Sequence, residues 1–287
     1  MKYCSYYGKL ASDFLVINAI NSIASARINF TLATSENNCS SLDIDGALSF
    51  SSPSLFTNIP IVQVLKDAGE IKEAVFGLFI NNFTLSETES FPEAALEIGG
   101  FNLSYYSSDP EALFYLNTTS FSGTWNVNFE TVQMGIWTGG PSMVVFSSTQ
   151  RYVIGDLNAY LSFVPYLSLM GLDCEEIPNN FVIKCKKNKK VQLPEFTFNV
   201  GENSFTLPRY SIWDCDSDYC TLQIQFKIAG QWILGQIFLE NYFTIYNYDN
   251  SSIGFAPAAI SRLKKRTDDS SFSATLTYCL LYSLLTN

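Results

Sequence analysis

The 287-residue sequence predicts an all-β protein, and three observations lead to this prediction. Short segments with alternating apolar and polar residues recur along the chain, helical periodicity is scarce, and turn residues separate the segments at short intervals. Aromatic and charged residues each make up 15%, which argues against a disordered chain. No fixed-period repeat is evident, so we do not expect a propeller or a solenoid.

Four segments alternate most clearly and are expected to be half-buried antiparallel strands: residues 26–32, 125–129, 196–200 and 222–228. A hairpin is predicted where residues 243–246 and 253–255 flank the turn 249–252. Helices are expected at three places only. Residues 60–69 carry Pro at the start and Gly at the end, Asp156 is placed to cap a helix over 156–161, and residues 238–242 form the third.

Composition excludes several chemistries. The chain has no His, so a Ser-His-Asp triad, a Cys-His pair and a His-ligated zinc site are all ruled out. With 17 basic and 27 acidic residues the net charge is −10, which makes nucleic acid an unexpected partner. The acidic residues of 214–218 lack the Gly and the final Glu of a calcium loop and predict a surface turn, so no metal or cofactor is expected. The basic run 184–190 predicts a solvated hairpin loop rather than a binding patch.

Seven cysteines leave two interpretations open. None of them forms a Cys-x-x-Cys pair, so they are either buried free thiols of a cytosolic protein or, as we favour, disulfides formed in an oxidising compartment. Six glycosylation sequons give mild support to secretion, and they begin at Asn29, Asn38, Asn82, Asn102, Asn117 and Asn250.

The two ends of the chain differ from its middle. Residues 1–8 contain no apolar run long enough for a signal peptide, so the protein is cytosolic or the chain begins inside a longer protein. Residues 262–266 are basic, 267–271 are polar, and 272–287 are moderately apolar but short for a membrane span. We expect a disordered tail or, alternatively, membrane attachment through a lipid-anchor signal in this tail.

Several segments, in this order, resemble the pepsin-like aspartic peptidases. Residues 45–48 are similar to the family's Asp-Gly-Ile-Leu block, and 96–101 to its Phe-Gly-Gly segment between the lobes. The most specific match is the closing block, made of residues 232–235, 238–239, 242–244 and 253–257. The resemblance covers about residues 4–258 and implies a bilobal acid-protease fold. We therefore expect a partial first lobe with flap and interlobe strand over 1–100, a second lobe over 101–258, and a basic, polar and apolar tail over 259–287.

The resemblance also implies a site. In this family each lobe supplies an Asp from an Asp-Thr-Gly loop, and the two carboxylates share a proton and activate a water that attacks the peptide carbonyl. Tyr7 and Gly8 resemble the flap, which follows the first Asp-Thr-Gly, so that motif is absent here and the first lobe is predicted to be incomplete. In the run 143–150, Phe146 stands for the second Asp, Ser147 for Thr and Ser148 for Gly, while Thr149 matches the family's next hydroxyl residue. Substrate contacts are expected from Tyr7, Gly8 and Thr149.

The degenerate motif has one alternative reading. Asp156 is the nearest acid downstream, but no Thr-Gly follows it and it is well placed as a helix cap, so we do not take it as catalytic. The family's second-lobe disulfide implies a Cys185–Cys220 pair, with Cys174–Cys215 and Cys4–Cys39 as further pairs.

Three functions follow as hypotheses. The first is an inactive relative, a pseudopeptidase that binds extended peptides between its lobes. The second is an active aspartic endopeptidase, which the resemblance alone would suggest, and the third is a surface glycoprotein with a structural role. We expect a monomer with a peptide or protein ligand, in the secretory pathway, lysosome-like compartments or at the cell surface if a signal peptide precedes the chain.

Overall fold

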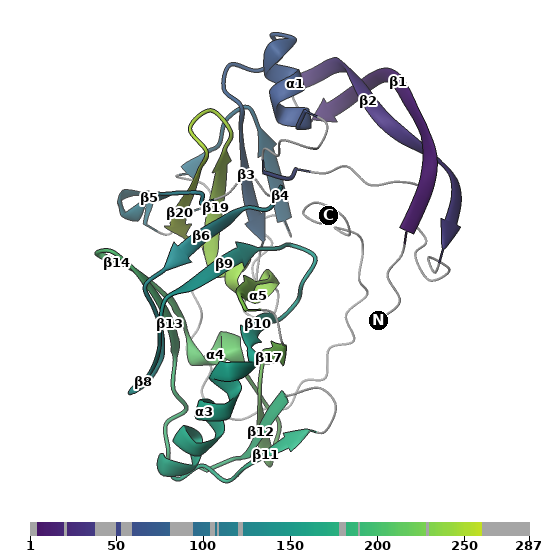
Figure 1. The fold of residues 1–287 in the computed structure, drawn as a ribbon. Coiled ribbons are helices and arrows are strands. Elements are labelled where there is room, and N and C mark those ends of the chain that lie inside the picture. Colours follow the sequence, from purple (N-terminus) through teal and green to yellow (C-terminus); the bar gives the residue numbers. More distant parts are fainter. Residues whose placement is uncertain are drawn as a thin grey trace.

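Figure 1 shows the computed structural model of the chain. It describes residues 5–19, 22–37, 50–52, 59–80, 94–103, 107, 109–119, 123–177, 182–188, 190–227 and 230–259. For most of the first two strands it describes the backbone alone. Cys4, Cys39, Asn38, Asn82 and the predicted tail beyond residue 259 lie outside the described residues.

The protein is built mainly of β-strands, which confirms the predicted all-β class. Two strands near the start, β1 (Ser5–Ala19) and β2 (Ser22–Asn37), form a long antiparallel hairpin. The remaining described strands form two five-stranded and two four-stranded sheets. Most pairs are antiparallel, and the parallel ones are β10 with β17 and β9 with β18.

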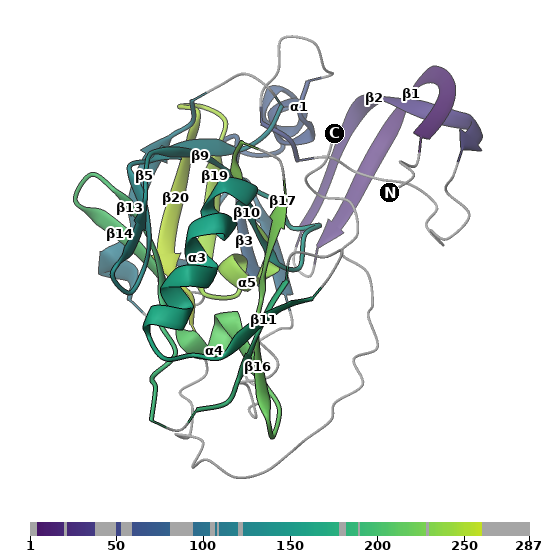
Figure 2. The same ribbon diagram turned by 60° about the horizontal axis from the view of Figure 1, so that its bottom comes forward.

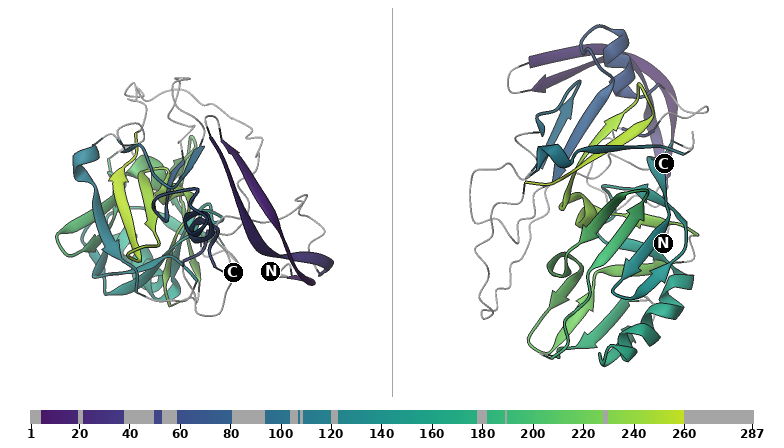
Figure 3. Two further views of the ribbon diagram at one scale, coloured as in Figure 1. Left: turned by 90° about the horizontal axis from the view of Figure 1, so that it is seen from above. Right: turned by 90° about the vertical axis from the view of Figure 1, so that its left-hand side faces the viewer.

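One five-stranded sheet joins distant parts of the chain. Its order is β4 (Ala94–Ile98), β3 (Val75–Ile80), β19 (Tyr242–Asn247), β20 (Ser252–Pro257) and β5 (Phe114–Asn117). β19 and β20 form the hairpin that the sequence predicts around residues 249–252. Figure 3 shows this sheet beside α1 and set apart from the sheets that follow. β19 pairs with β3, so this sheet contains strands from both sides of residue 100. The predicted lobe boundary at residue 100 stays a prediction.

The second five-stranded sheet carries the candidate site. Its order is β17 (Ile224–Lys227), β10 (Val153–Asp156), β18 (Trp232–Leu234), β9 (Ser142–Phe146) and β6 (Asn126–Phe129). The predicted strand at 125–129 corresponds to β6, and the predicted strand at 196–200 is present in the four-stranded sheet described next. The segment 222–228 is divided, because β16 ends at Leu222 and β17 starts at Ile224. The prediction of an antiparallel strand is wrong for residues 224–227, because β17 pairs with β10 in parallel.

The two four-stranded sheets complete the fold. One has the order β14 (Asn203–Leu207), β13 (Phe196–Val200), β7 (Thr131–Met134) and β8 (Trp137–Gly139). The other has the order β11 (Cys174–Ile177), β12 (Val182–Lys186), β16 (Tyr219–Leu222) and β15 (Trp213–Cys215). β12 contains the start of the basic run, so the prediction of a loop over 184–190 is wrong for Lys184 and Lys186.

The predicted helices are present with shifted ends. α1 (Ile61–Asp67) follows Pro60, and Gly69 beyond its end has a φ of +77°, the left-handed conformation typical after a helix. α3 (Leu157–Leu169) starts after Asp156 as predicted but runs eight residues further, because Phe163 and Leu167 on its inner face are fully buried and hold it on the sheets. α5 (Gln236–Leu239) begins earlier than predicted, and Tyr242 already belongs to β19.

Two further short elements are α4 (Arg209–Ile212) and a 3-10 turn, η1 (Pro110–Ala112). The interior is rich in aromatic side chains. Trp125 is 1% exposed and its indole N–H donates to the Phe50 carbonyl at 2.8 Å. Phe76 stacks on Tyr246 with 4.5 Å between ring centroids. Aromatic packing of this kind supplies much of the buried apolar area of the fold.

Candidate functional site

The loop that follows β9 occupies the position of the predicted degenerate motif. β9 lies between β18, its parallel neighbour, and β6, its antiparallel neighbour. A run of consecutive apolar residues lets β9 sit inside the sheet, with Val144 and Val145 buried just before the loop. At the strand end the Phe146 N–H donates to the Trp125 carbonyl and the Ser147 N–H to the Leu234 carbonyl, each at 3.0 Å. The loop therefore starts from a fixed point in the middle of a sheet.

The residues before α5 hold the far side of the loop. The Gln236 N–H donates to the Gln150 carbonyl at 2.7 Å, and its side-chain amide donates to the Ser148 carbonyl at 3.2 Å. Gly235 makes this approach possible, since a Cβ atom there would lie 2.2 Å from the Gln150 oxygen and 2.5 Å from that of Tyr152. The Ile-Leu-Gly segment of the closing block thus serves to clamp the loop.

Phe146, at the position of the missing carboxylate, is a core residue. It is 1% exposed, and its ring centroid lies 5.4 Å from that of Phe238 and 5.1 Å from that of Phe255. These rings come from α5 and β20. A benzyl side chain in this apolar setting can neither take up a proton nor bind a polarised water.

The rest of the loop offers hydroxyl groups. Ser147 and Ser148 are each 4% exposed, and the Ser147 hydroxyl lies 3.0 Å from that of Thr149. The Ser148 hydroxyl is buried without a hydrogen-bond partner. Thr149 is partly exposed. Serine and threonine hydroxyls without an adjacent base are weak nucleophiles, so the loop alone holds hydrogen-bonding groups but no acid or base.

No carboxyl pair replaces the dyad within the described part of the chain. The hydrogen-bonding partners found there for Asp and Glu side chains are amides, hydroxyls and amines, and no bond joins two carboxyl groups. Nowhere in the sequence does an Asp precede Thr-Gly or Ser-Gly. Asp156 caps α3 by accepting from the Asn158 N–H at 3.4 Å, as predicted.

Glu240, just after α5, is the one acid of this region whose ionisation is strongly perturbed. Burial raises its pKa to about 7, and the nearby Arg151 opposes that rise. The sequence analysis did not single out this residue, because its burial arises only when the chain is folded. A single buried carboxyl group next to a cation is more typical of a structural group than of a catalytic dyad.

The predicted flap residues lie in the first hairpin. Tyr7 pairs with Ser35 and Gly8 with Ala33, and the strand register shifts between these two pairs. Figures 1 and 2 show the hairpin beside α1, and in Figure 1 β11 and β12 lie at the opposite end of the molecule. The side chain of Tyr7 lies outside the described residues, so substrate contacts by Tyr7, Gly8 and Thr149 stay a prediction.

Four of the cysteines form disulfides, but not in the pairs predicted for them. The predicted Cys4–Cys39 pair lies outside the described residues and stays a prediction. The structure joins Cys174 to Cys185 and Cys215 to Cys220. The predicted pairs Cys185–Cys220 and Cys174–Cys215 are therefore wrong. Cys174 and Cys215 lie on the two outer strands of a four-stranded sheet, and three strand spacings, about 14 Å, separate them. A disulfide spans at most about 7 Å between Cα atoms.

Strand register explains the pairing that is found. Cys174 lies opposite Cys185, Cys185 opposite Cys220, and Cys220 opposite Cys215. Hydrogen-bonded and non-hydrogen-bonded pairs alternate along antiparallel strands, and side chains are closer in the second kind. Backbone bonds join Lys186 to Asp173, Lys187 to Asp218 and Asp216 to Tyr219. By this alternation the two outer cysteine pairs are of the closer kind, and their Cα atoms are 3.9 and 4.0 Å apart.

Three of the six predicted glycosylation residues have described side chains. Asn102, Asn117 and Asn250 are all exposed. Asn29 lies in β2, where only the backbone is described. Within the described residues, no helix is both long and apolar enough to cross a membrane.

The arrangement of sheets described above is consistent with the all-β fold of the pepsin-like aspartic peptidases. The family model of the eukaryotic aspartyl proteases matches residues 3–258. The chain belongs to this family, in agreement with the predicted resemblance to pepsin-like peptidases.

Curated relatives support the same assignment. The chain is 24% identical to "Cathepsin D" of Mus musculus, with 75% of this chain and 53% of the relative covered. It is 26% identical to "Gastricsin" of Homo sapiens (75% and 55%) and 24% identical to "Pepsin A" of Bos taurus (75% and 56%). The chain thus spans about half the length of the curated relatives it matches.

Proposed function

We propose that this chain is a non-catalytic member of the eukaryotic aspartyl protease family that binds extended peptides without cleaving them. The observation that supports the proposal is the packing of Phe146, which the family resemblance aligns with the second catalytic Asp, against Phe238 and Phe255. Loss of a general acid–base group alone removes roughly 10²–10⁴-fold of rate. The surrounding apolar rings also leave no place where a carboxylate from elsewhere could be solvated.

A cleavage assay tests the inactive half of this proposal. The full chain is incubated between pH 3 and 7 with a diverse peptide library, with and without a statine-containing peptide that mimics the transition state. We expect no cleavage that the statine peptide blocks, while a pepsin-like enzyme run in parallel is both active and inhibited. Statine-sensitive cleavage by the purified chain would overturn the proposal in favour of an active endopeptidase.

The binding half rests on the retained frame of the loop. Gly235 and Gln236 still hold the backbone of 148–150, and the Thr149 hydroxyl is partly exposed. Saturable binding of members of a peptide library is expected, and Thr149→Val should weaken it severalfold by removing one hydrogen bond. Thr221→Val, on β16, is the matched control. Absence of saturable binding by the folded chain would contradict this half.

A second property is favoured by other residues. Two disulfides and three exposed sequon asparagines, Asn102, Asn117 and Asn250, support passage through the secretory pathway and glycosylation. Expression of the chain behind a secretion signal, followed by removal of N-linked glycans, should lower its apparent mass. Single Asn→Gln variants at the three positions assign the sites, and an unchanged mass would contradict this proposal.

A further inference from the structure

Four cysteines form a continuous row across the β11–β12–β16–β15 sheet. Directly opposite residues of antiparallel strands point to the same face, so all four sulfur atoms lie on one side of the sheet. Three neighbouring pairs exist in this row, and the structure bridges the two outer ones. The unused central pair, Cys185 and Cys220, is a hydrogen-bonded pair with an expected Cα distance of about 5.5 Å. That distance also lies within the range of disulfides, about 4.4–6.8 Å.

The four positions differ in access. Cys185 is fully buried and Cys220 is 3% exposed, whereas Cys215 is exposed and Cys174 is partly exposed. Both outer cysteines belong to edge strands. An external reagent therefore reaches the row from its ends, while the inner pair is shielded.

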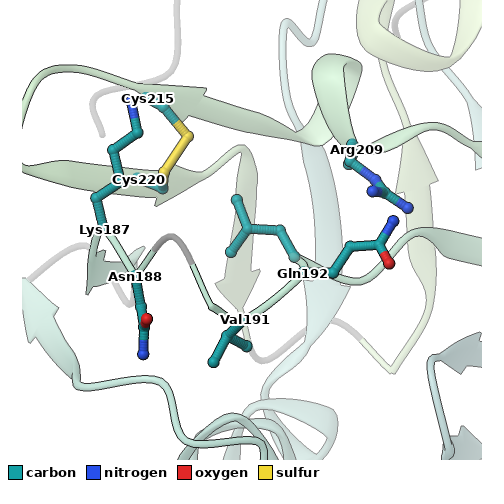
Figure 4. Close-up of a pocket in the computed structure, with 8 residues that line it drawn as sticks. Lys187, Asn188, Val191, Gln192, Arg209, Cys215 and Cys220 are labelled. Carbon is teal, nitrogen blue, oxygen red and sulfur yellow. A yellow bond between two sulfur atoms is a disulfide. The ribbon is translucent and has the colours of Figure 1, made fainter. Parts of the chain in front are cut away.

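A pocket adjoins the exposed end of the row. It has a volume of 210 Å³, and the Cys215–Cys220 disulfide forms part of its wall (Figure 4). Its charged lining residues are Lys187 and Arg209, its polar ones are Asn188 and Gln192, and none of its described lining residues carries a carboxylate. This is unusual in a chain with a net charge of −10. Arg209 has a loose contact of 3.8 Å with Glu195, between two half-exposed side chains, and its guanidinium also faces the uncharged side chain of Gln192. Backbone hydrogen bonds from Tyr219 and Asp218 lower the pKa of the exposed Asp216 carboxyl group, and Lys187 lies close enough to lower it further.

We propose that this pocket admits a small thiol bearing carboxylate groups, and that its reaction at Cys215 moves the row from two outer disulfides to a single central Cys185–Cys220 disulfide. The cations Lys187 and Arg209 attract the carboxylates of the thiol and favour its thiolate form. The buried position of the central pair protects the product from a second attack.

The exchange balances in three steps. The thiolate of the small molecule attacks the Cys215 sulfur, a mixed disulfide forms there, and Cys220 leaves as a thiolate. Cys220 attacks the Cys185 sulfur opposite it, the new bond forms, and Cys174 leaves as a thiolate and takes a proton from water. A second small thiol then releases Cys215 from the mixed disulfide. In sum, two small thiols lose two electrons and become one disulfide, and the protein gains two thiols, at Cys174 and Cys215.

The consequence is a change at both edges of the sheet. The outer disulfides tie the edge strands β11 and β15 to their neighbours, and the central disulfide ties β12 to β16 instead. The rearranged form keeps the centre of the sheet closed and leaves the edge strands held by backbone hydrogen bonds alone. The row thus provides two covalent states of one fold, selected by the surrounding thiol.

Peptide mapping tests the rearrangement directly. The oxidised full chain is incubated with graded ratios of reduced and oxidised glutathione, quenched in acid and alkylated with N-ethylmaleimide. Proteolysis without reduction, followed by mass spectrometry, then assigns the bonds. We expect an intermediate in which Cys185 is bonded to Cys220 and both Cys174 and Cys215 are alkylated. Loss of the two outer disulfides without any Cys185–Cys220 peptide would overturn the proposal.

A variant isolates the transfer step. Cys215→Ser leaves Cys220 without its partner, so Cys220 should capture Cys185, and the alkylated thiol should be Cys174. The double variant Cys215→Ser/Cys220→Ser is the control, since it should keep the Cys174–Cys185 disulfide. Alkylation of Cys220 beside an intact Cys174–Cys185 disulfide in the single variant would contradict the transfer.

The charge of the pocket is tested by rate. The combined change Lys187→Gln and Arg209→Gln should slow the reaction of glutathione about fivefold relative to that of neutral 2-mercaptoethanol, as expected for a weak surface attraction. Lys72→Gln, an exposed cation distant in sequence, should leave the ratio unchanged. Equal slowing of both thiols, or no slowing of either, would refute the preference for an anionic thiol.

Discussion

In both the loop after β9 and the row of cysteines, strand pairing positions the side chains. The two regions differ in the reactivity of the side chains placed there. In both, strand register fixes where each residue lies: Leu234 opposite Phe146 in the first, and Cys185 opposite Cys220 in the second. In the first region a buried phenyl ring ends the strand before the loop that the family resemblance aligns with a catalytic motif. The second brings four reactive sulfur atoms into line. Membership of a fold family therefore fixes positions, and the side chain at each position decides what chemistry remains.

The largest expected loss of stability comes from replacing Phe146 by an acidic residue. Phe146→Asp removes the ring that packs on Phe238 and Phe255 and places a carboxyl group in an apolar site, so we expect a loss of about 4 kcal/mol in unfolding free energy at pH 7. Burial raises the pKa of such a carboxyl group, so the loss should be smaller at pH 4 than at pH 7. Urea unfolding at both pH values measures it.

The conservative variant Phe146→Leu, with a loss of about 1 kcal/mol, is the control for this comparison. If Phe146→Asp were as stable as the natural chain at pH 7, the site would be polar rather than apolar. The interpretation that the loop keeps its backbone position but lacks a catalytic side chain would then be wrong.

The second-largest loss of stability is expected from a change at Gly235, which holds the loop after β9 in place. Gly235→Ala places a Cβ atom 2.2 Å from the Gln150 oxygen, and a backbone oxygen cannot move away as a side chain can. We expect a loss of about 3 kcal/mol, or failure to fold. Gly140→Ala, where an added Cβ atom would meet nothing within 4 Å, is the matched control. Equal midpoints of chemical unfolding for the two variants would show that the clamp on the loop is dispensable.

The sequence predicted the first region far better than the second. The family resemblance of the run 143–150 singled out Phe146, and local patterns predicted the 243–255 hairpin and the cap at Asp156, because each depends on residues close in sequence. The disulfide pairs depend on the register of four strands from segments 174–186 and 213–222, which no local pattern encodes. The need for Gly235 likewise arises only when residue 150 is brought beside it.

A third prediction concerns Glu240, the acid that this region retains. Its pKa is about 7 in the fold and about 4.5 in the unfolded chain, so the folded state binds the proton more tightly. The stability that this group contributes is complete below pH 4.5 and is lost as the pH rises towards 7, by about 3 kcal/mol. Glu240→Gln should remove this part of the pH dependence in urea unfolding at pH 5 and pH 8. An unchanged pH dependence in the variant would mean that Glu240 is solvated.

The smallest expected effect separates a structural acid from a catalytic one. Asp156 accepts from the N–H and the side-chain amide of Asn158 at the start of α3, at 3.4 and 3.1 Å. Asp156→Ala should cost about 1 kcal/mol through loss of the cap, whereas Asp156→Asn, which keeps an acceptor, should cost a few tenths. Thermal unfolding of the two variants measures the difference. As a structural cap, Asp156 should not affect peptide binding, so we expect the natural chain and Asp156→Asn to bind peptides equally. A loss of binding in Asp156→Asn alone would place Asp156 in the ligand site.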